Sequence, residues 1–133
     1  MDTAIRDRVK AFFTTAPDVV AVYVFGSQAR GESGPDSDVD VAVLFDKAPV
    51  ATLMGPRLAL EGDLERHLGR PVDLVTLNTA SADLVHRVLR DGDLVCERDR
   101  NHRIWFEVTR RNEYFDLQPI RDLYRRSAAR VRA

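Results

Sequence analysis

Three aspartates set in apolar strands are the residues of this sequence best suited to chemistry. Asp38 and Asp40 flank Val39 at the start of a valine-rich run, and Asp73 lies inside the later run "PVDLVTL". Strand side chains alternate between the faces of a sheet, so Asp38 and Asp40 share one face with their Cα atoms about 6.5–7 Å apart. Two ionised carboxylates at that distance repel each other unless a cation lies between them. The pair therefore predicts a cation site.

The donor atoms of this site indicate which cation it would hold. No cysteine and no paired histidines lie near the acids in the sequence, and oxygen ligands alone favour Mg²⁺, or Mn²⁺, over zinc. If the strand that carries Asp73 neighbours the strand that carries Asp40, the three carboxylates can meet at one place. We therefore predict that Asp38, Asp40 and Asp73 bind divalent metal.

The residues just after the first predicted strand are suited to hold phosphate. Gly26 and Ser27 follow it directly, and a glycine lets a phosphate approach the backbone while the N–H groups of a following helical turn face the anion. The Ser27 hydroxyl adds one donor. Arg30 lies one turn further on and could either clamp phosphate oxygens or pair with one of the acids. A phosphate cradle, a metal pair and a third acid together indicate phosphoryl or nucleotidyl transfer.

The elements that must position these residues follow from hydrophobic periodicity and from turn signals. Segments with helical spacing of apolar residues alternate with short valine-rich runs, and glycine or proline separates them. This order predicts an α+β fold, a small mixed β-sheet flanked by α-helices. Pro119 should break or kink the last helix near Gln118. The expected elements are helices at 3–15, 58–68, 84–89 and from 99 onward, strands at 19–25, 39–45, 71–77 and 94–96, and a loop at 26–37 with one helical turn at 27–30.

Length and composition bound the class of protein. At 133 residues the chain is most simply one domain, 1–133, with a helical C-terminal segment at about 99–133. A net charge of −1 gives no reason to expect direct nucleic-acid binding or an anionic membrane. No apolar run approaches the ~18 residues that span a bilayer, and the single cysteine, Cys96, fits a buried side chain in a reducing compartment. These features predict a soluble cytoplasmic protein.

The C-terminal segment interleaves arginines with aromatic residues. Such a run can bind nucleic acid or a protein partner. The alternative is that its apolar residues close the domain's own core, which we expect before Pro119, with a partner contact after it. The apolar residues in question are Ile104, Trp105, Val108 and Phe115.

The stretch "GSQARGESGPDSDVDVAVLF", followed later by "VDLV", resembles the signature of the polymerase-β-like nucleotidyltransferase superfamily. That signature is Gly-Ser, ten residues, Asp-x-Asp, and an aspartate in a later strand. More narrowly, the chain resembles the minimal nucleotidyltransferase (MNT) antitoxins of HEPN/MNT toxin–antitoxin pairs. The match covers residues 23–45 and 71–77, and the rest agrees in length and element order. The resemblance implies a palm-like nucleotidyltransferase fold.

The resemblance also implies a role for each matched residue. Gly26 and Ser27 would hold the β- and γ-phosphates of ATP, Asp38 and Asp40 would bind the catalytic Mg²⁺ ions, and Asp73 would complete a metal site and help deprotonate the attacking hydroxyl. Arg30 fits the same loop. All these residues are present in this sequence.

The implied function is that of an antitoxin enzyme. It would transfer AMP from ATP to a tyrosine of a HEPN ribonuclease toxin, its partner in a hetero-oligomer, and so neutralise that toxin. Two alternatives stay open. One is an antitoxin that occludes its toxin without catalysis, and the other is a nucleotidyltransferase that modifies a small molecule of the aminoglycoside type.

Overall fold

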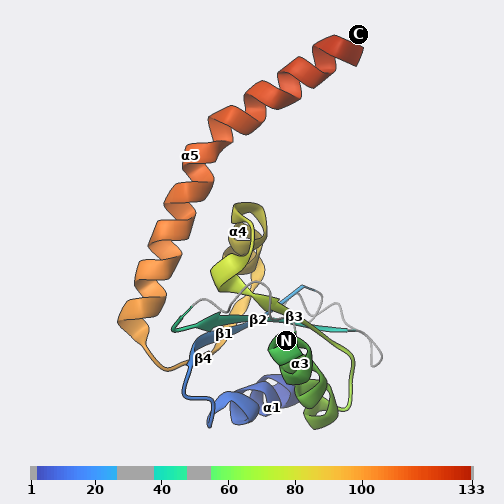
Figure 1. Cartoon of the computed structure of the whole chain (residues 1–133), viewed down its shortest axis with the longest axis vertical. Helices are drawn as coiled ribbons and strands as arrows, with labels where there is room; N and C mark the ends of the chain where they lie inside the picture. The colour runs from blue at the N-terminus through green and yellow to red at the C-terminus, as the bar shows by residue number, and fades with distance from the viewer. Residues whose placement is uncertain (1–2, 27–37, 48–54, 133) are drawn as a thin grey trace.

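A computed structural model of the chain describes residues 3–26, 38–47 and 55–132. Its centre is a four-stranded mixed sheet with the strand order β3-β2-β1-β4 (Figure 1). β1 pairs antiparallel with β2 and with β4, whereas β2 pairs parallel with β3. The strands are β1 (Val19–Phe25), β2 (Val39–Phe45), β3 (Val72–Thr76) and β4 (Asp93–Glu97). The predicted α+β fold with a mixed sheet is confirmed.

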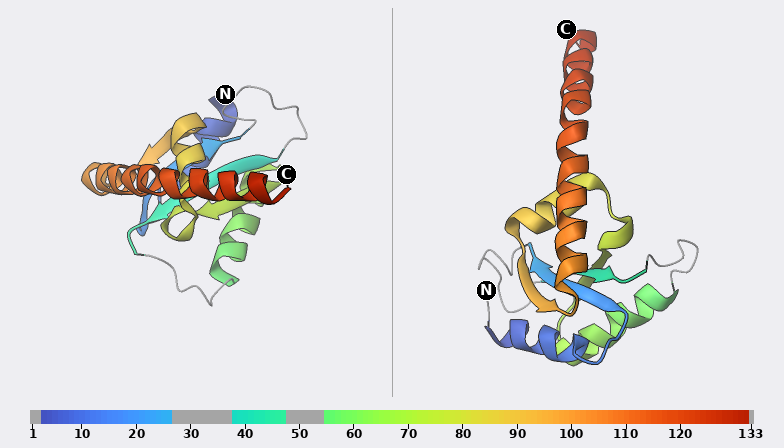
Figure 2. Two further views of the ribbon diagram at one scale, coloured as in Figure 1. Left: turned by 90° about the horizontal axis from the view of Figure 1, so that it is seen from above. Right: turned by 90° about the vertical axis from the view of Figure 1, so that its left-hand side faces the viewer.

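Helices cover both faces of this sheet. α1 and α3 lie on one face, and α4 and the first part of α5 lie on the other (Figures 1 and 2). The rest of α5 projects beyond the sheet and beyond α4. The helices are α1 (Thr3–Phe13), α3 (Gly55–Leu68), the short 3₁₀ helix η1 (Leu77–Thr79), α4 (Ala82–Asp91) and α5 (Arg100–Arg132).

β1 is the central strand of the molecule, and all seven of its side chains are buried. A strand covered on both faces has no polar side to present to water, which explains its unbroken run of valine and aromatic residues. Val22 and Val24 pack toward α1 and α3, whereas Tyr23 and Phe25 pack toward α4 and α5. β1 therefore contributes side chains to both cores, as β2 also does.

Local signals place the helix ends close to where the sequence predicted them. Gly69 follows α3 with a φ of +69°, the left-handed conformation that glycine adopts without steric cost. Ser81 caps α4, because its side chain accepts a hydrogen bond from the Leu84 N–H at 3.2 Å. The Gly92 N–H closes the same helix by donating to the Val88 carbonyl at 2.8 Å.

β3 is an edge strand, and side chains of α3 occupy the edge that no strand pairs with. Glu65 accepts from the Val72 N–H at 3.0 Å, and Glu61 accepts from the Leu74 N–H at 2.8 Å. Arg57 donates to the Leu74 carbonyl at 3.1 Å. Backbone groups that would otherwise lack partners at this edge are therefore satisfied on either side of Asp73.

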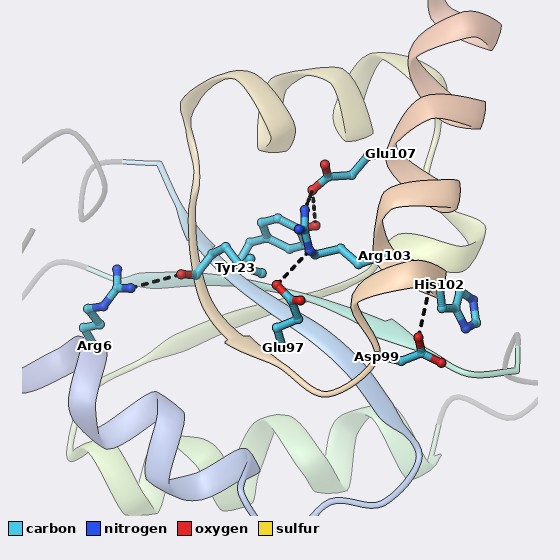
Figure 3. A network of polar contacts seen from close by, with 8 residues as sticks. Arg6, Tyr23, Glu97, Asp99, His102, Arg103 and Glu107 are labelled. Carbon is cyan, nitrogen blue, oxygen red and sulfur yellow. Dashed lines mark hydrogen bonds and ion pairs between the residues drawn. The ribbon is translucent and has the colours of Figure 1, made fainter.

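A polar network fixes the start of α5 to the sheet (Figure 3). The Tyr23 hydroxyl donates to Glu107 at 2.6 Å, and Arg103 forms ion pairs with Glu97 and Glu107 at 3.0 Å. Burial, followed by the bond to Glu107, raises the pKa of the Tyr23 phenol far above its ordinary value. The phenol therefore stays protonated and keeps donating.

Of two predictions about α5, the first holds only as a bend and the second is wrong. The helix does not break at Pro119 but continues through it to Arg132, along a curved path (Figure 1). A proline removes one backbone donor and clashes with the carbonyl of the preceding turn, and a long helix absorbs this by bending. The residues expected to close the core before Pro119 are instead exposed, because Phe106 and the polar network occupy the face of α5 that meets the domain. The exposed residues are Ile104, Trp105, Val108 and Phe115.

Two smaller observations complete the fold. Cys96 is half-buried and packs against the core beside α1, as a free cysteine. Within the three described ranges, no helix combines the length and the apolar character needed to cross a membrane.

Candidate active site

Asp40 and Asp73 lie side by side on neighbouring strands. They are direct partners in the parallel register of β2 and β3, and Val39 and Val41 pair with Val72 and Leu74 on either side. Neighbouring strands are about 4.8 Å apart, and directly paired residues point to the same face. The structure therefore brings together two carboxylates that lie 33 positions apart in the sequence.

Gly26 sits directly against the Asp40 carboxylate. A Cβ atom added to Gly26 would lie only 2.1 Å from Oδ2 of Asp40, and the residue has a φ of +69°. Phe25, just before it, is the β1 partner of Asp40. Both the backbone conformation and the lack of space require glycine here, so the end of β1 and the acid of β2 form one compact unit.

These residues line one pocket of about 430 Å³ on the sheet face that α4 covers. Its volume lies in the range of small-molecule sites. The described residues that line it include three carboxylates and one cationic side chain, so the pocket is predominantly acidic. The lining residues are Phe25, Gly26, Asp40, Asp73, Val75, Leu84, Arg87 and Asp91.

The other predicted site residues either lie outside this pocket or fall outside the described residues. Asp38 is exposed, lies just before β2 and does not line this pocket. Ser27 and Arg30 fall outside the described residues, so their predicted phosphate contacts stay predictions. Among the described residues, no group of three or more histidine, cysteine or acidic side chains is close enough to hold a metal ion. The structure therefore unites Gly26, Asp40 and Asp73 and leaves Asp38 apart from them.

The acids that do meet fit a hard divalent cation. Asp40 is half-buried and Asp73 is exposed to the pocket, so both offer carboxylate oxygens to a ligand that enters it. Oxygen donors from neighbouring strands, without thiol or imidazole, are the donor set that Mg²⁺ prefers.

Arg87 is a pocket residue that the sequence did not reveal. It lies on α4 three residues after Leu84 and four before Asp91, a spacing that places all three on one side of the helix. In the part of the chain that the structure describes, it makes no hydrogen bond or ion pair, whereas its neighbour Arg90 binds Asp91 through two hydrogen bonds of 2.9 Å. The helical spacing was visible in the sequence, but nothing there showed that this side of α4 faces the strand acids.

A second pocket, of about 480 Å³, lies between α1 and β4. Its lining includes Phe13, Leu94 and Val95 beside Lys10 and Glu97. It is slightly larger, but it lacks paired carboxylates and lies on the opposite side of the sheet core. We therefore assign the chemistry to the acidic pocket.

Comparison with known proteins identifies the family. A family model described as polymerase beta, nucleotidyltransferase, matches residues 7–101, more than half of the chain. The matched range contains Gly26, Asp40 and Asp73. The chain belongs to the polymerase β nucleotidyltransferase family. The resemblance inferred from the Gly-Ser and Asp-x-Asp signature is therefore confirmed at the level of the family.

Similar proteins of the nucleotidyltransferase family include two named as protein adenylyltransferase MntA. The one from Thermococcus cleftensis is 41% identical over 68 residues, which cover 51% of this chain and 66% of the relative. The one from Aphanizomenon flos-aquae is 29% identical over 102 residues, covering 70% of this chain and 67% of the relative. The chain thus spans about two thirds of the length of these relatives.

A solved structure extends the likeness along almost the whole nucleotidyltransferase chain. It is a crystal structure of a toxin–antitoxin with AMP-PNP, an analogue of ATP, and it matches with a TM-score of 0.80 at 26% identity. The superposition covers 93% of this chain and 98% of the other, so it includes most of α5.

Proposed function

We propose that this protein is a Mg²⁺-dependent adenylyltransferase that transfers AMP from ATP to a tyrosine of a HEPN-type toxin and thereby neutralises it. The observation that carries the proposal is the pairing of Asp40 with Asp73 beside Gly26, at the mouth of one acidic pocket. The names of the two MntA relatives and the toxin–antitoxin structure with AMP-PNP support the nucleotide, the reaction and the class of partner. The protein would act as one domain in the cytoplasm.

The proposed reaction is a displacement at the α-phosphorus of ATP. The acceptor hydroxyl oxygen forms a bond to this phosphorus, while the bond to the oxygen shared with the β-phosphate breaks and pyrophosphate leaves. Asp40 and Asp73 would hold a divalent metal, with Asp38 at the start of β2 assigned as a further ligand, and the metal would neutralise charge on the phosphates. Asp73 is exposed to the pocket and is assigned the proton of the acceptor hydroxyl.

The remaining residues are assigned to binding of the triphosphate. The backbone of Gly26 at the end of β1 is assigned a contact with phosphate, as are Ser27 and Arg30, which follow it in the sequence. Arg87 lines the same pocket and has no hydrogen-bond or ion-pair partner within the described ranges, and we assign it a contact with phosphate oxygens. We assign no residue to the base of the nucleotide.

Labelling of the toxin tests the proposal directly. The protein and its cognate toxin are incubated with Mg²⁺ and ATP labelled at the α-phosphate, and transfer of label to the toxin is measured. Asp40→Asn removes one pocket carboxylate with little change in size, and we expect it to slow transfer by roughly 100-fold or more. Asp7→Asn, an exposed position on α1, is the matched control and should keep wild-type transfer. Transfer that survives Asp40→Asn would refute the assigned chemistry.

Occlusion without catalysis is the second candidate function, because α5 exposes large apolar side chains suited to protein binding. Growth rescue in cells that express the toxin separates the two. Rescue by the Asp40→Asn variant at wild-type strength would show that binding alone neutralises the toxin, whereas failed rescue by a variant that still binds would show that transfer is required.

A further inference from the structure

α5 carries a row of exposed apolar side chains. Among the described residues, six large hydrophobic side chains are exposed, and five of them lie on this helix. Trp105 is 67% exposed and Phe115 is 59% exposed, although both are residue types usually buried. We call the five residues the α5 stripe: Ile104, Trp105, Val108, Phe115 and Leu123.

The stripe occupies one side of the helix. At 3.6 residues per turn its members fall within an arc of about 100°, and they extend for about 28 Å along the helix axis. The domain lies on the other side, where Phe106 is buried against the sheet layer and Arg103 and Glu107 form the polar network. The helix therefore has two faces: one holds it to the domain, and the other, apart from an edge contact between the rings of Phe115 and His86 of α4, is exposed among the described residues.

The attachment of α5 presents the stripe in a fixed orientation. Tyr23 and Glu97 of the sheet bind Glu107 and Arg103 (Figure 3), and Arg110 donates to the carbonyl oxygens of Leu77 and Ala80. A helix held in this way loses little freedom when a partner binds, which reduces the entropic cost of association.

Charge selects the kind of partner. Residues 117–133 contain five arginines and one aspartate, a formal charge of +4, and residues 100–116 contain four arginines and three acidic residues, a formal charge of +1. Two copies of α5 packed stripe to stripe would place net positive segments against each other in either orientation. A different protein with an apolar groove and acidic residues at its rim meets both features of the helix.

We propose that the α5 stripe is the docking surface for the acceptor protein, the toxin that receives AMP, and that this toxin presents an apolar groove with an acidic rim. This inference rests on the proposed function for the identity of the partner. It adds that the toxin is held on a surface distinct from the acidic pocket, since no residue of the α5 stripe lines that pocket.

Binding of the toxin by stripe variants tests the proposal. The dissociation constant is measured by titration calorimetry with the intact protein and its cognate toxin, without ATP. Because aromatic residues at the centre of an interface dominate its affinity, Trp105→Glu or Phe115→Glu should weaken binding by about 30-fold or more. Leu58→Glu replaces the sixth exposed large hydrophobic, which lies on α3, and is the matched control with unchanged affinity. Equal affinity of the Trp105 variant and the wild type would overturn the proposal.

Trp105 also provides a direct reporter, because it is the chain's single tryptophan. With 5-fluorotryptophan incorporated only in this protein, addition of the toxin should shift the ¹⁹F resonance, and an unshifted resonance in the complex would overturn the proposal. Sedimentation of the protein alone gives a second check: a dimer that Trp105→Glu dissociates would identify a second copy as the occupant and likewise overturn it.

Failure of this inference is distinguishable from failure of the proposed function. Docking is read from complex formation, which requires no transfer, and transfer is read from the α-phosphate label. Asp40→Asn should bind the toxin with wild-type affinity while its transfer of AMP is slower by roughly 100-fold or more. Trp105→Glu should bind a fluorescent ATP analogue as the wild type does while losing the toxin.

Discussion

Gly26 and Asp40 depend on each other at the level of single atoms. The left-handed φ of Gly26 and the 2.1 Å between a hypothetical Cβ and Oδ2 of Asp40 mean that the carboxylate occupies the space a side chain would fill. The neighbouring Asp73 is fixed by strand register rather than by contact with a loop. Backbone geometry, through strand register and the conformation of Gly26, thus sets the positions of the two acids.

A methyl group at Gly26 is therefore expected to damage both stability and chemistry. Gly26→Ala should cost about 1–2 kcal/mol of unfolding free energy through its backbone conformation, and by displacing the Asp40 carboxylate it should slow AMP transfer by about 100-fold. Gly69→Ala is the matched control, with the same φ of +69° but no atom within 4 Å. Chemical denaturation should show a comparable loss of stability for Gly69→Ala, whereas its rate of AMP transfer should equal that of the wild type. Similar rates for both variants would contradict this account.

The two strand acids could be predicted from the sequence, but the other residues of their pocket only in part. Asp40 and Asp73 stand out because a carboxylate in a valine-rich strand is costly without a partner. Arg87 gave no such signal, since an arginine on an amphipathic helix is ordinary and its direction depends on how α4 packs on the sheet. For Asp38 the sequence predicted more than the structure shows. The alternation of strand side chains placed it on the same face as Asp40, but Asp38 precedes β2 and lacks the strand pairing that would fix its position.

At the scale of elements, α5 is held to the domain by hydrogen bonds, by ion pairs and by ring contacts such as the stacking of Tyr114 on His86 of α4, with ring centroids 3.8 Å apart. Phe106 is its buried apolar residue, whereas Tyr23, Arg103, Glu107 and Arg110 supply the polar contacts. This division explains why the sequence predicted the helix but mistook its orientation. Apolar residues occur around much of α5, and periodicity alone could not show that polar residues face the sheet.

The Tyr23 phenol should make part of this attachment sensitive to alkali. Burial raises its pKa in the folded protein, so above the ordinary value near pH 10 the unfolded chain releases this proton first and stability falls. Tyr23→Phe should lower the unfolding free energy by about 1.5 kcal/mol at neutral pH, because it removes a hydrogen bond to a charged group. The difference between wild type and variant should then shrink as the pH rises from about 10 to about 11. A difference that stays constant in urea denaturation across this range would contradict the prediction.

At the scale of the whole molecule, charge is separated along the long axis. The chain has a net charge of −1, and residues 117–133 carry +4, so the remaining residues carry −5. The positive charge belongs to the part of α5 that projects from the domain (Figure 2). A partner with an acidic rim would be attracted first to that end, and would approach the α5 stripe in one orientation.

The association rate with the toxin should depend on this separation. Arg125→Gln combined with Arg126→Gln should slow association by about 10-fold at low salt, with little change in the dissociation rate, because steering acts before contact. The wild-type rate should fall as salt is added, and the variant rate should fall less. Arg66→Gln, an exposed position on α3, is the control. Association rates, measured by stopped flow, that change neither with salt nor with the arginine substitutions would rule out electrostatic steering.

The glutamates of α3 at the β3 edge have a consequence beyond the native fold. An open strand edge is a template on which other chains can polymerise, and Glu61 and Glu65 already occupy the backbone donors of Leu74 and Val72. A second molecule could add a strand there only by displacing both carboxylates from these backbone donors. The contacts that satisfy the backbone on either side of Asp73 therefore oppose fibrous assembly of this protein along that edge.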